Sequence, residues 1–393
     1  MRSLTWEQVL AWRVARSHLD DRLSRDALSA VARDTCGIQA QVLPAAELCL
    51  GIRSEATQQD VREQLWEDRS LVKTYGLRST LHLFAADEVA LWMAAMRIPR
   101  LTPSPWYEAH GLDASQTTAL VDAVRDALDG KRLTRVELGD AVAARMGRWA
   151  GDRLAAPWAD LLDVASHSGV LCYGPSRGAK ATFVRVDQWT GRSDEIAPED
   201  AMPEVVKRYL STYGPAHHAD FAQWFQMRPS IAKKWFQSVA NELEEVDVEG
   251  TRLWMASGVS GAELASAKDS VRLLPQYDCY VIGSRQRSRF VPEPARKRIS
   301  AYGRGRFEGP VAVPLLVING VVAGMWKRAT RAGGQLVTVE PFTRLTKDHR
   351  RRLEAEAARL GRFYGTDATL SIASLQGDHN RFSRSSSSRK GMP

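Results

Sequence analysis

The chain has 393 residues, of which 44% are apolar and 25% are charged, as in an ordinary globular protein. This composition excludes a fibrous or mainly disordered chain, and the length suggests two or three domains. Lys and Arg total 54 against 46 Asp and Glu, which gives a formal net charge of +8. Such a charge favours a polyanionic partner, with nucleic acid the first expectation.

Neither a membrane span nor a secretion signal is expected. The apolar stretches are interrupted well before the roughly 18 residues that a span requires, and residues 1–20 lack an unbroken apolar core. We therefore expect a cytoplasmic protein associated with the nucleoid. The cysteines are far apart in sequence, which predicts buried thiols rather than a zinc site or a disulfide framework: Cys36, Cys49, Cys172 and Cys279.

Helix-rich stretches closed by short strand pairs recur three times. The first begins at Thr5, whose spacing to Gln8 predicts a capping box, and ends with a hairpin over 71–84 around Gly76. The second has predicted helices over 115–128 and 134–145, another near Pro157, and a strand pair over 171–186.

The third repeat predicts helices over 204–212, 220–226 and 230–239, followed by a hairpin over 243–256. Helix, turn, helix and hairpin in this order indicate a winged helix, a fold whose last helix fits a DNA major groove. Winged helices also serve as protein-interaction modules, so the fold alone leaves both uses open. Linkers are expected over 99–105 and 191–203.

The remaining chain changes to a strand pattern. Strands over 311–318 and 321–327 flank Asn319-Gly320, which predicts a tight hairpin, and a helix over 347–364 follows. Four consecutive serines within 383–390 predict a disordered tail. The expected domains are therefore 1–100, 101–200 and 201–270, each with helices closed by a strand pair, then a β-rich C-terminal subdomain over 271–365 and the tail 366–393, in an α+β fold.

Gln39-Ala40-Gln41 lies between Gly37, where one helix should end, and Pro44, which suits the start of the next. Residues two apart share a face only in an extended chain. A helix junction here would point both amides into one cavity, whereas two unrelated surface glutamines remain the simpler interpretation of these residues alone.

Two further segments carry polar or basic groups. A strand over 77–84 would place Arg78, Thr80 and His82 on one face, although a half-exposed strand without function would show the same alternation. The segment 284–306 has eight basic residues against Glu293, which indicates either DNA-backbone binding or a solvated loop: Arg285, Arg287, Arg289, Arg296, Lys297, Arg298, Arg304 and Arg306. No metal motif, phosphate-binding loop or dinucleotide fingerprint is present, so no cofactor and no metal are expected.

Several strings together resemble the AlkZ-type DNA glycosylases, and the resemblance runs from Thr5 to Tyr364. They are Gln39-Ala-Gln41, Leu77-Arg-Ser-Thr-Leu-His-Leu83, Leu273-Leu-Pro-Gln-Tyr-Asp278 with Gly283 and Arg287, and Ile318-Asn-Gly-Val-Val-Ala-Gly-Met-Trp-Lys327. The chain departs from the pattern at Ser79, where relatives often have glycine, and at Gln276.

The resemblance implies that 1–100, 101–200 and 201–270 are three tandem winged helices that form a concave DNA-binding surface. It also implies catalysis by Gln39 and Gln41, in the Gln-x-Gln form of members that act on bulky adducts and crosslinks. It implies a monofunctional glycosylase that removes cationic N7- or N3-alkylated purines from duplex DNA, in repair and in self-resistance to a genotoxic antibiotic, and we expect a monomer. The expected DNA contacts are Arg78, Thr80, His82, Arg285, Arg287 and Arg289, with four motif positions whose role could equally be structural: Tyr277, Asp278, Trp326 and Lys327.

Two other classes of protein would share parts of this pattern. A winged-helix transcription regulator that responds to a toxic small molecule would have the same folds and charge, but it would need a dimerisation element, and no long heptad repeat is present. A drug-sequestering protein would bind the free alkylating agent and ignore DNA.

Overall fold

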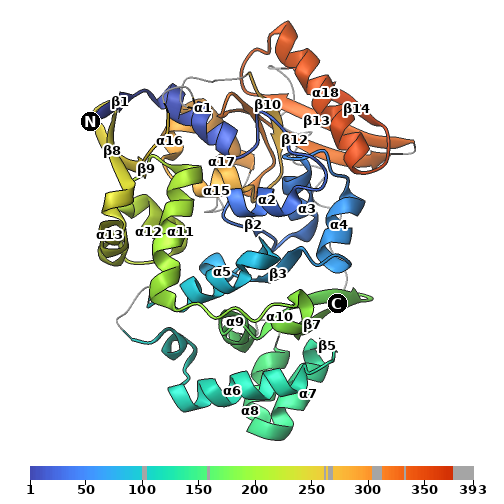
Figure 1. The fold of residues 1–393 in the computed structure, drawn as a ribbon. Coiled ribbons are helices and arrows are strands. Elements are labelled where there is room, and N and C mark those ends of the chain that lie inside the picture. The colour runs from blue at the N-terminus through green and yellow to red at the C-terminus, as the bar shows by residue number, and fades with distance from the viewer. Residues whose placement is uncertain are drawn as a thin grey trace.

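The computed structural model describes residues 1–99, 104–156, 160–260, 263, 269–302, 312–331 and 333–374. Their helices and strands fall into four groups, each built around a small sheet (Figure 1). This mixed architecture agrees with the predicted α+β class. No helix within the described residues is both long enough and apolar enough to cross a membrane.

The first unit spans residues 28–96 and occupies the centre of the view in Figure 1. It consists of α2 Leu28–Asp34, β2 Ile38–Gln39, α3 Leu43–Gly51, α4 Gln58–Trp66, β3 Leu71–Tyr75, the 3-10 turn η1 Leu77–Ser79, β4 Leu81–Ala85, the 3-10 turn Ala86–Glu88 and α5 Val89–Met96. The predicted hairpin is confirmed. The strand order is β2-β4-β3, so β4 is the central strand, and all five of its residues are buried.

The second unit spans residues 106–190. It consists of the 3-10 turn Trp106–His110, α6 Ala114–Ala127, β5 Leu133–Thr134, α7 Arg135–Met146, α8 Arg148–Ala155, α9 Asp160–His167, β6 Leu171–Arg177, β7 Lys180–Arg185 and α10 Val186–Thr190. The predicted capping box at Thr134 forms with Glu137 and starts α7. Helix α8 was not predicted, and the helix expected near Pro157 corresponds to α9, although residues 157–159 lie outside the described chain.

The third unit spans residues 198–256. It consists of α11 Pro198–Tyr213, α12 His218–Phe225, α13 Pro229–Ser238, the 3-10 turn Ala240–Glu242, β8 Leu243–Val248 and β9 Thr251–Ala256. The predicted linker over 191–203 is too long, because α11 already begins at Pro198 and continues through Pro203. A proline there removes one backbone hydrogen bond, whereas Ala201, Met202 and Val205 around it are fully buried, and their packing outweighs the loss.

Residues 2–6 pack on the third unit, which corrects the expected domain over 1–100, whereas Leu10 and Val14 join the core cluster that includes the first unit. β1 Arg2–Leu4 pairs in parallel with β8, and α1 Trp6–Arg16 starts at the predicted capping box. Arg2 also forms an ion pair with Glu244 at 2.6 Å. The side chains of Leu4 and Trp6 join a hydrophobic cluster from β8 and β9, so burial of apolar surface fixes this long-range pairing.

The C-terminal unit spans residues 269–374 and carries a five-stranded sheet with the order β10-β11-β12-β13-β14. Its elements are β10 Val271–Leu274, α15 Cys279–Gly283, α16 Arg287–Phe290, α17 Glu293–Tyr302, β11 Leu315–Ile318, β12 Val321–Arg331, β13 Gly334–Pro341, α18 Lys347–Phe363 and β14 Ala368–Ile372. The expected boundary at 365 is wrong, because β14 adds a parallel edge strand to β13. The serine-rich segment 383–390 lies outside the described residues.

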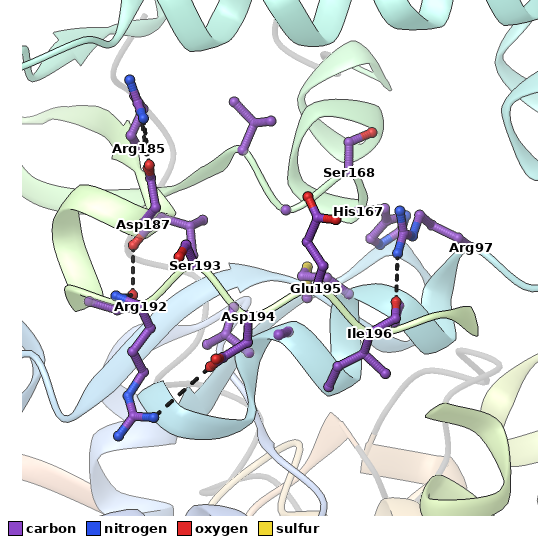
Figure 2. Close-up of a pocket in the computed structure, with 18 of the residues that line it drawn as sticks. Arg97, His167, Ser168, Arg185, Asp187, Arg192, Ser193, Asp194, Glu195 and Ile196 are labelled. Carbon is purple, nitrogen blue, oxygen red and sulfur yellow. Dashed lines mark hydrogen bonds and ion pairs between the residues drawn. The ribbon is translucent and has the colours of Figure 1, made fainter. Parts of the chain in front are cut away.

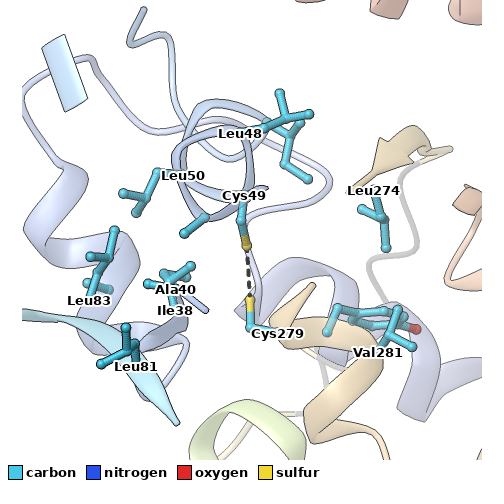
Figure 3. Packing of buried hydrophobic residues seen from close by; sticks show 14 of the residues in the cluster. Ile38, Ala40, Leu48, Cys49, Leu50, Leu81, Leu83, Leu274, Cys279 and Val281 are labelled. Atoms are coloured by element: carbon cyan, nitrogen blue, oxygen red, sulfur yellow. Dashed lines mark hydrogen bonds between the residues drawn. The ribbon is translucent and has the colours of Figure 1, made fainter. Parts of the chain in front are cut away.

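A buried ion pair joins the first unit to the C-terminal unit. The Arg53 guanidinium, just after α3, donates to both carboxylate oxygens of Asp278 at 2.7 and 2.8 Å, and both side chains are fully buried. Asp278 also caps α15 by accepting from the Tyr280 N–H at 2.9 Å. Beside this pair, Cys49 of α3 meets Cys279 of α15 (Figure 3).

We predict that breaking this ion pair from one side strongly destabilises the fold. Asp278→Asn or Arg53→Met leaves an unpaired polar or charged group in the core and should lower the free energy of unfolding by about 3–5 kcal/mol. Replacing both at once, Arg53→Met with Asp278→Leu, should cost less than either single change. Chemical denaturation measures this, with Arg125→Met in the exposed Arg125–Asp122 pair as a control that should change stability by less than about 1 kcal/mol. Equal effects at the two pairs would contradict the prediction.

Candidate functional site

A glycine positions the segment that carries the two candidate glutamines. Gly37, between α2 and β2, has a φ of +85°, and a Cβ there would come within 2.4 Å of the Phe84 ring. Glycine is the residue that adopts this backbone without strain and without that clash. The chain can therefore turn directly from α2 into the short strand β2.

Gln39 and Gln41 flank the fully buried Ala40 at the end of β2. Ala40 still donates its N–H to the carbonyl oxygen of Leu81 on β4 at 2.6 Å, so the chain remains paired to the sheet here. Side chains two residues apart in extended chain lie on the same side. Gln39 is half-buried and Gln41 is exposed, which is the arrangement expected of a junction that presents both amides together.

Each glutamine carbonyl oxygen accepts a hydrogen bond from a group that can only donate. Arg78 Nη2 donates to Gln39 Oε1 at 3.4 Å, and the Leu81 N–H donates to Gln41 Oε1 at 3.3 Å. Because guanidinium and backbone N–H groups have no acceptor atom, both amides must turn their oxygens toward these partners. Their NH₂ groups are then directed away, and each oxygen keeps a second lone pair.

Arg78 bridges the first and third units. Its backbone has a φ of +57° in the 3-10 turn η1, and its Nη1 donates to the carbonyl oxygen of Trp224 on α12 at 2.6 Å. Burial, together with nearby Arg285, lowers the pKa of Arg78 to about 10. The side chain therefore remains a cation at neutral pH, and it was predicted as a DNA contact without any signal of this internal bonding.

The expected strand over 77–84 is wrong in its first half. Arg78 and Ser79 both have positive φ, so the chain reverses there and β4 begins only at Leu81. Thr80 donates its hydroxyl to the Leu77 carbonyl oxygen at 3.0 Å within the turn. The expected polar face of Arg78, Thr80 and His82 does not exist, because β4 is a central strand that is buried on both faces.

His82 is buried rather than presented to a DNA backbone. Its Nδ1 lies 2.9 Å from the Thr80 carbonyl oxygen, which can only accept, so Nδ1 carries the proton. The ring stacks against Phe84 with centroids 5.5 Å apart. Burial, helped by the Arg78 charge, lowers the pKa of His82 to about 3. The imidazole is therefore neutral near pH 7.

Two of the four motif positions have structural roles. Asp278 is enclosed by its ion pair with Arg53, and Trp326 is 4% exposed and donates its Nε1–H to the Leu274 carbonyl oxygen at 2.8 Å. Neither side chain reaches the surface. The expectation that they contact DNA is corrected by their burial and by the completeness of their hydrogen bonds.

The other two motif positions are partly accessible. Tyr277 has a φ of +60° and packs partly buried against the core cluster that includes Leu77 and Tyr213. Lys327 is half-buried on β12, where burial lowers the pKa of its ammonium. These two side chains remain candidate DNA contacts.

Six of the eight basic residues of the predicted segment lie within the described residues, and three of these six were expected to contact DNA. Arg285 donates from Nε to Gln223 on α12 at 3.1 Å, and burial with the Arg285 charge lowers the pKa of Arg287 to about 10. Within the described residues, neither Arg285 nor Arg287 has an acidic partner within 4 Å. Arg289 is exposed, with its guanidinium 4.8 Å from the Trp6 ring centroid. Arg304 and Arg306 lie outside the described chain.

Segments far apart in the sequence meet beside Gln39. They line a small, partly open cavity of about 10 Å³, room for about one water molecule. It is lined by Thr35, Cys36, Gly37, Gln39, Leu77, Arg78, His82, Tyr213, Trp224, Cys279 and Ile282. The fold thus brings together three segments of the family pattern: the Gln-x-Gln segment, the β3–β4 turn and the segment 273–283. Their joint occurrence in one pattern implied this.

Several residues of this junction were not predicted. The carbonyl oxygen of Trp224 anchors Arg78, and Gln223 holds Arg285, both from α12. A hydrogen bond to a backbone carbonyl oxygen cannot be predicted from the pattern of side chains. A single exposed glutamine does not indicate a binding partner either. Arg53, the partner of Asp278, was missed because nothing local in a sequence links two residues so far apart.

The four cysteines are free and buried, as predicted, although the sulfur atoms of Cys49 and Cys279, far apart in sequence, lie 3.7 Å apart. With Asp278 they form a buried group whose ligand atoms lie within 4.8 Å of one another. Arg53, however, holds both Asp278 oxygens and lies 3.1 Å from Cys49 Sγ, and burial raises the pKa of the Cys49 thiol. The Arg53 guanidinium would repel a metal cation, and a thiol must lose its proton to bind one. This donor set therefore fits the ion pair instead.

A larger cavity lies elsewhere. A cleft of about 860 Å³ separates α5 from the segment 185–198 (Figure 2). Arg185 pairs with Asp187 and Arg192 with Asp194 along its wall, so charges of both signs line it. No predicted site residue is among the described residues that line this cleft. We place the candidate site at Gln39 and Gln41 because the convergent polar groups are there.

Comparisons with known proteins agree with the sequence resemblance. A family model described as "DNA glycosylase AlkZ-like" matches residues 32–363. A curated protein of Streptomyces sahachiroi, the "Interstrand DNA cross-link repair glycosylase", is 33% identical over 372 residues, which are 92% of this chain and 97% of the relative. The solved structure of "Streptomyces sahachiroi DNA glycosylase AlkZ" matches with a TM-score of 0.81 and 31% identity, and the match covers 95% of this chain and all of that one.

The depressed pKa of His82 predicts a loss of stability in acid. Between the ordinary value of 6.5 and about 3, the unfolded chain holds a proton at this imidazole that the folded chain lacks. The free energy of unfolding should therefore fall as pH decreases through this window, by up to about 1.4 kcal/mol per pH unit from this group. Thermal or urea unfolding from pH 7 to pH 4 should show a shallower decline for His82→Asn, which keeps a donor for Thr80. Identical slopes in both proteins would refute the assignment.

Proposed function

The chain belongs to the DNA glycosylase AlkZ-like family, and from this premise we propose that it hydrolyses the N-glycosidic bond of cationic N7- or N3-alkylated purines in duplex DNA. It is a DNA glycosylase, and the proposal concerns its substrates, its site and its mechanism. The name of the Streptomyces sahachiroi relative supports action on interstrand crosslinks in DNA repair. We extend the proposal to bulky adducts and to self-resistance to a genotoxic antibiotic. The family match favours this function over a transcription regulator or a drug-sequestering protein.

We also propose that the three helical units are winged helices that together form the concave DNA-binding surface. The first and second units each run from a helix through a short strand and further helices to a hairpin. In the third, Ala216 takes the place of the short strand by pairing with Trp254. The repeated order supports a common fold, since each unit buries its helices on its own hairpin sheet.

The proposed chemistry needs no general acid. A purine alkylated at N7 or N3 is already cationic, so the base departs as a neutral molecule without being protonated. What remains is to hold a water molecule beneath C1′ while positive charge develops on the sugar, and oriented amide dipoles can do this. Gln39 and Gln41 each keep one free oxygen lone pair and an NH₂ group for that purpose. The neutral, buried His82 supports a mechanism without proton donation.

Water, rather than an amine, is the proposed nucleophile, which makes the enzyme monofunctional. No lysine is among the described residues that line the cavity beside Gln39. Lys73, on β3, instead lies over the Tyr173 ring at 5.0 Å. A Schiff base with the sugar would require an amine within reach of C1′, so borohydride should trap no covalent protein–DNA species.

The lesion is proposed to stay in the duplex or to be only partly displaced. Enzymes that flip a base need a pocket of its size, and the cavity beside Gln39 has room for about one water molecule. The cationic Arg285 and Arg287 nearby, with Arg289, Thr80, Tyr277 and Lys327, are the proposed contacts with the DNA. We further propose that the protein acts as a monomer within the nucleoid, since a single chain supplies the whole junction.

We predict that Gln39→Ala and Gln41→Ala each lower base excision by at least about tenfold while duplex affinity stays nearly unchanged, because these amides act on the transition state. Single-turnover release of N7-alkylguanine and the resulting alkali-labile sites measure this. Gln59→Ala, an exposed glutamine of α4 that bonds only its neighbour Glu63, is the control.

The same assay tests the dependence on a cationic base. Uracil should be released about 10²- to 10⁴-fold more slowly than N7-alkylguanine, the usual contribution of a general acid that this site lacks. Comparable rates for the two bases, or wild-type rates in both glutamine variants, would refute the proposed mechanism.

Charge removal in the basic segment should weaken binding to every duplex alike. Arg285→Gln, Arg287→Gln and Arg289→Gln should each flatten the dependence of log K on log salt by about 0.9 for each phosphate that the protein no longer neutralises. Titrations at several salt concentrations measure the slope, and Arg125→Gln on α6 serves as a control for removal of an exposed charge. Unchanged slopes in all three variants would place the segment away from DNA.

A further inference from the structure

Arg78 was expected to contact DNA, yet its guanidinium donates hydrogen bonds to two groups of the protein, the Trp224 carbonyl oxygen and Gln39 Oε1. We propose that Arg78 is a positioning residue that fixes the orientation of the Gln39 amide for base excision. This inference rests on the proposed function, because it assigns a role relative to the proposed catalytic Gln39.

The backbone of the β3–β4 turn directs Arg78 inward. Arg78 and Ser79 have φ values of +57° and +53°, a left-handed conformation that costs energy for residues other than glycine. The turn is closed by hydrogen bonds from the Gly76 N–H to Thr80 O at 2.9 Å and from the Ser79 N–H to Gly76 O at 3.1 Å. Such a conformation is retained where the surrounding contacts demand it, and here it points a long cationic side chain toward β2 and α12.

One end of the guanidinium has a rigid anchor. Nη1 donates to the Trp224 carbonyl oxygen at 2.6 Å, which is a short, charge-assisted hydrogen bond. The Trp224 side chain is itself buried and packs with Tyr209, Tyr213 and Phe221, with ring centroids 4.9 to 6.1 Å apart. The planar guanidinium therefore cannot rotate without breaking this bond.

The other end faces Gln39. With Nη1 fixed, the geometry of the guanidinium sets where Nη2 lies, and Nη2 is 3.4 Å from Gln39 Oε1. A free amide can rotate by 180° and exchange its donor and acceptor. Opposite Arg78 only one orientation is favourable, the one that directs the Gln39 NH₂ group away from the guanidinium. The hydrogen bond also polarises the amide, which strengthens its dipole.

The test is a double-mutant cycle between Arg78 and Gln39. Lysine keeps the charge but cannot hold two acceptors in a fixed plane, so Arg78→Lys should lower single-turnover release of N7-alkylguanine by about tenfold. If Arg78 acts through Gln39, the same substitution in a Gln39→Ala background should cost less than about twofold. The salt dependence of duplex binding should be unchanged in Arg78→Gln, which removes the charge.

Arg69→Lys is the matched control. Arg69 also has a positive φ, +58°, but it stacks over the Trp189 ring at 4.2 Å, away from the glutamines. Its substitution should leave the excision rate within about twofold of wild type. If Arg78→Lys does not fold, Arg78→Gln repeats the cycle, since glutamine still offers an NH₂ donor group and places the same demand on the backbone.

The possible outcomes separate the two levels of the proposal. Three results would overturn the positioning role and leave the glycosylase mechanism standing. The first is an additional tenfold loss from Arg78→Lys in a Gln39→Ala background that is already slow, and the second is a wild-type rate in Arg78→Lys. The third is a salt slope reduced by about one unit in Arg78→Gln. A wild-type rate in Gln39→Ala would instead overturn the proposed catalytic assignment itself.

Discussion

The buried ion pair between Arg53 and Asp278 is the contact on which the arrangement of the site depends. It joins the end of α3 to the start of α15, and the carboxylate also caps α15. Two charges without exposure to water are tolerated only where their geometry is nearly complete, as it is here. Because the neighbouring Cys279 and Ile282 line the cavity beside Gln39, the same pair sets how closely the C-terminal unit approaches the glutamines.

The surroundings of Gln39 carry an excess of positive charge, whereas the glutamine amides themselves carry none. Cationic Arg78, Arg285 and Arg287 gather near neutral amides and an uncharged His82, and burial lowers the pKa of each of these four titratable side chains. An unbalanced positive field attracts the phosphates of DNA. The same field opposes any further cation at this place, whereas the neutral amide dipoles add no net charge to it.

Local signals in the sequence predicted the elements well, because capping boxes, turn residues and strand alternation act over a few residues. The helix starts at Thr5 and Thr134 and the hairpin at Asn319-Gly320 are examples. The family pattern brought Gln39 and Gln41 forward, which spacing alone could not have done. What failed depended on tertiary context: the left-handed turn at Arg78, the burial of His82 in a central strand, and the pairing of β1 with β8.

The same contacts determine the order in which the residues around Gln39 can assemble while the chain is being synthesised. Gln39, Arg78 and Trp224 leave the ribosome well before Asp278, and Arg53 has no counter-charge until that residue emerges. A nascent chain that has completed all three helical units still exposes the surface of α3 that later receives α15. The growing polypeptide therefore completes its three helical units before the Arg53–Asp278 pair can join them to the C-terminal unit.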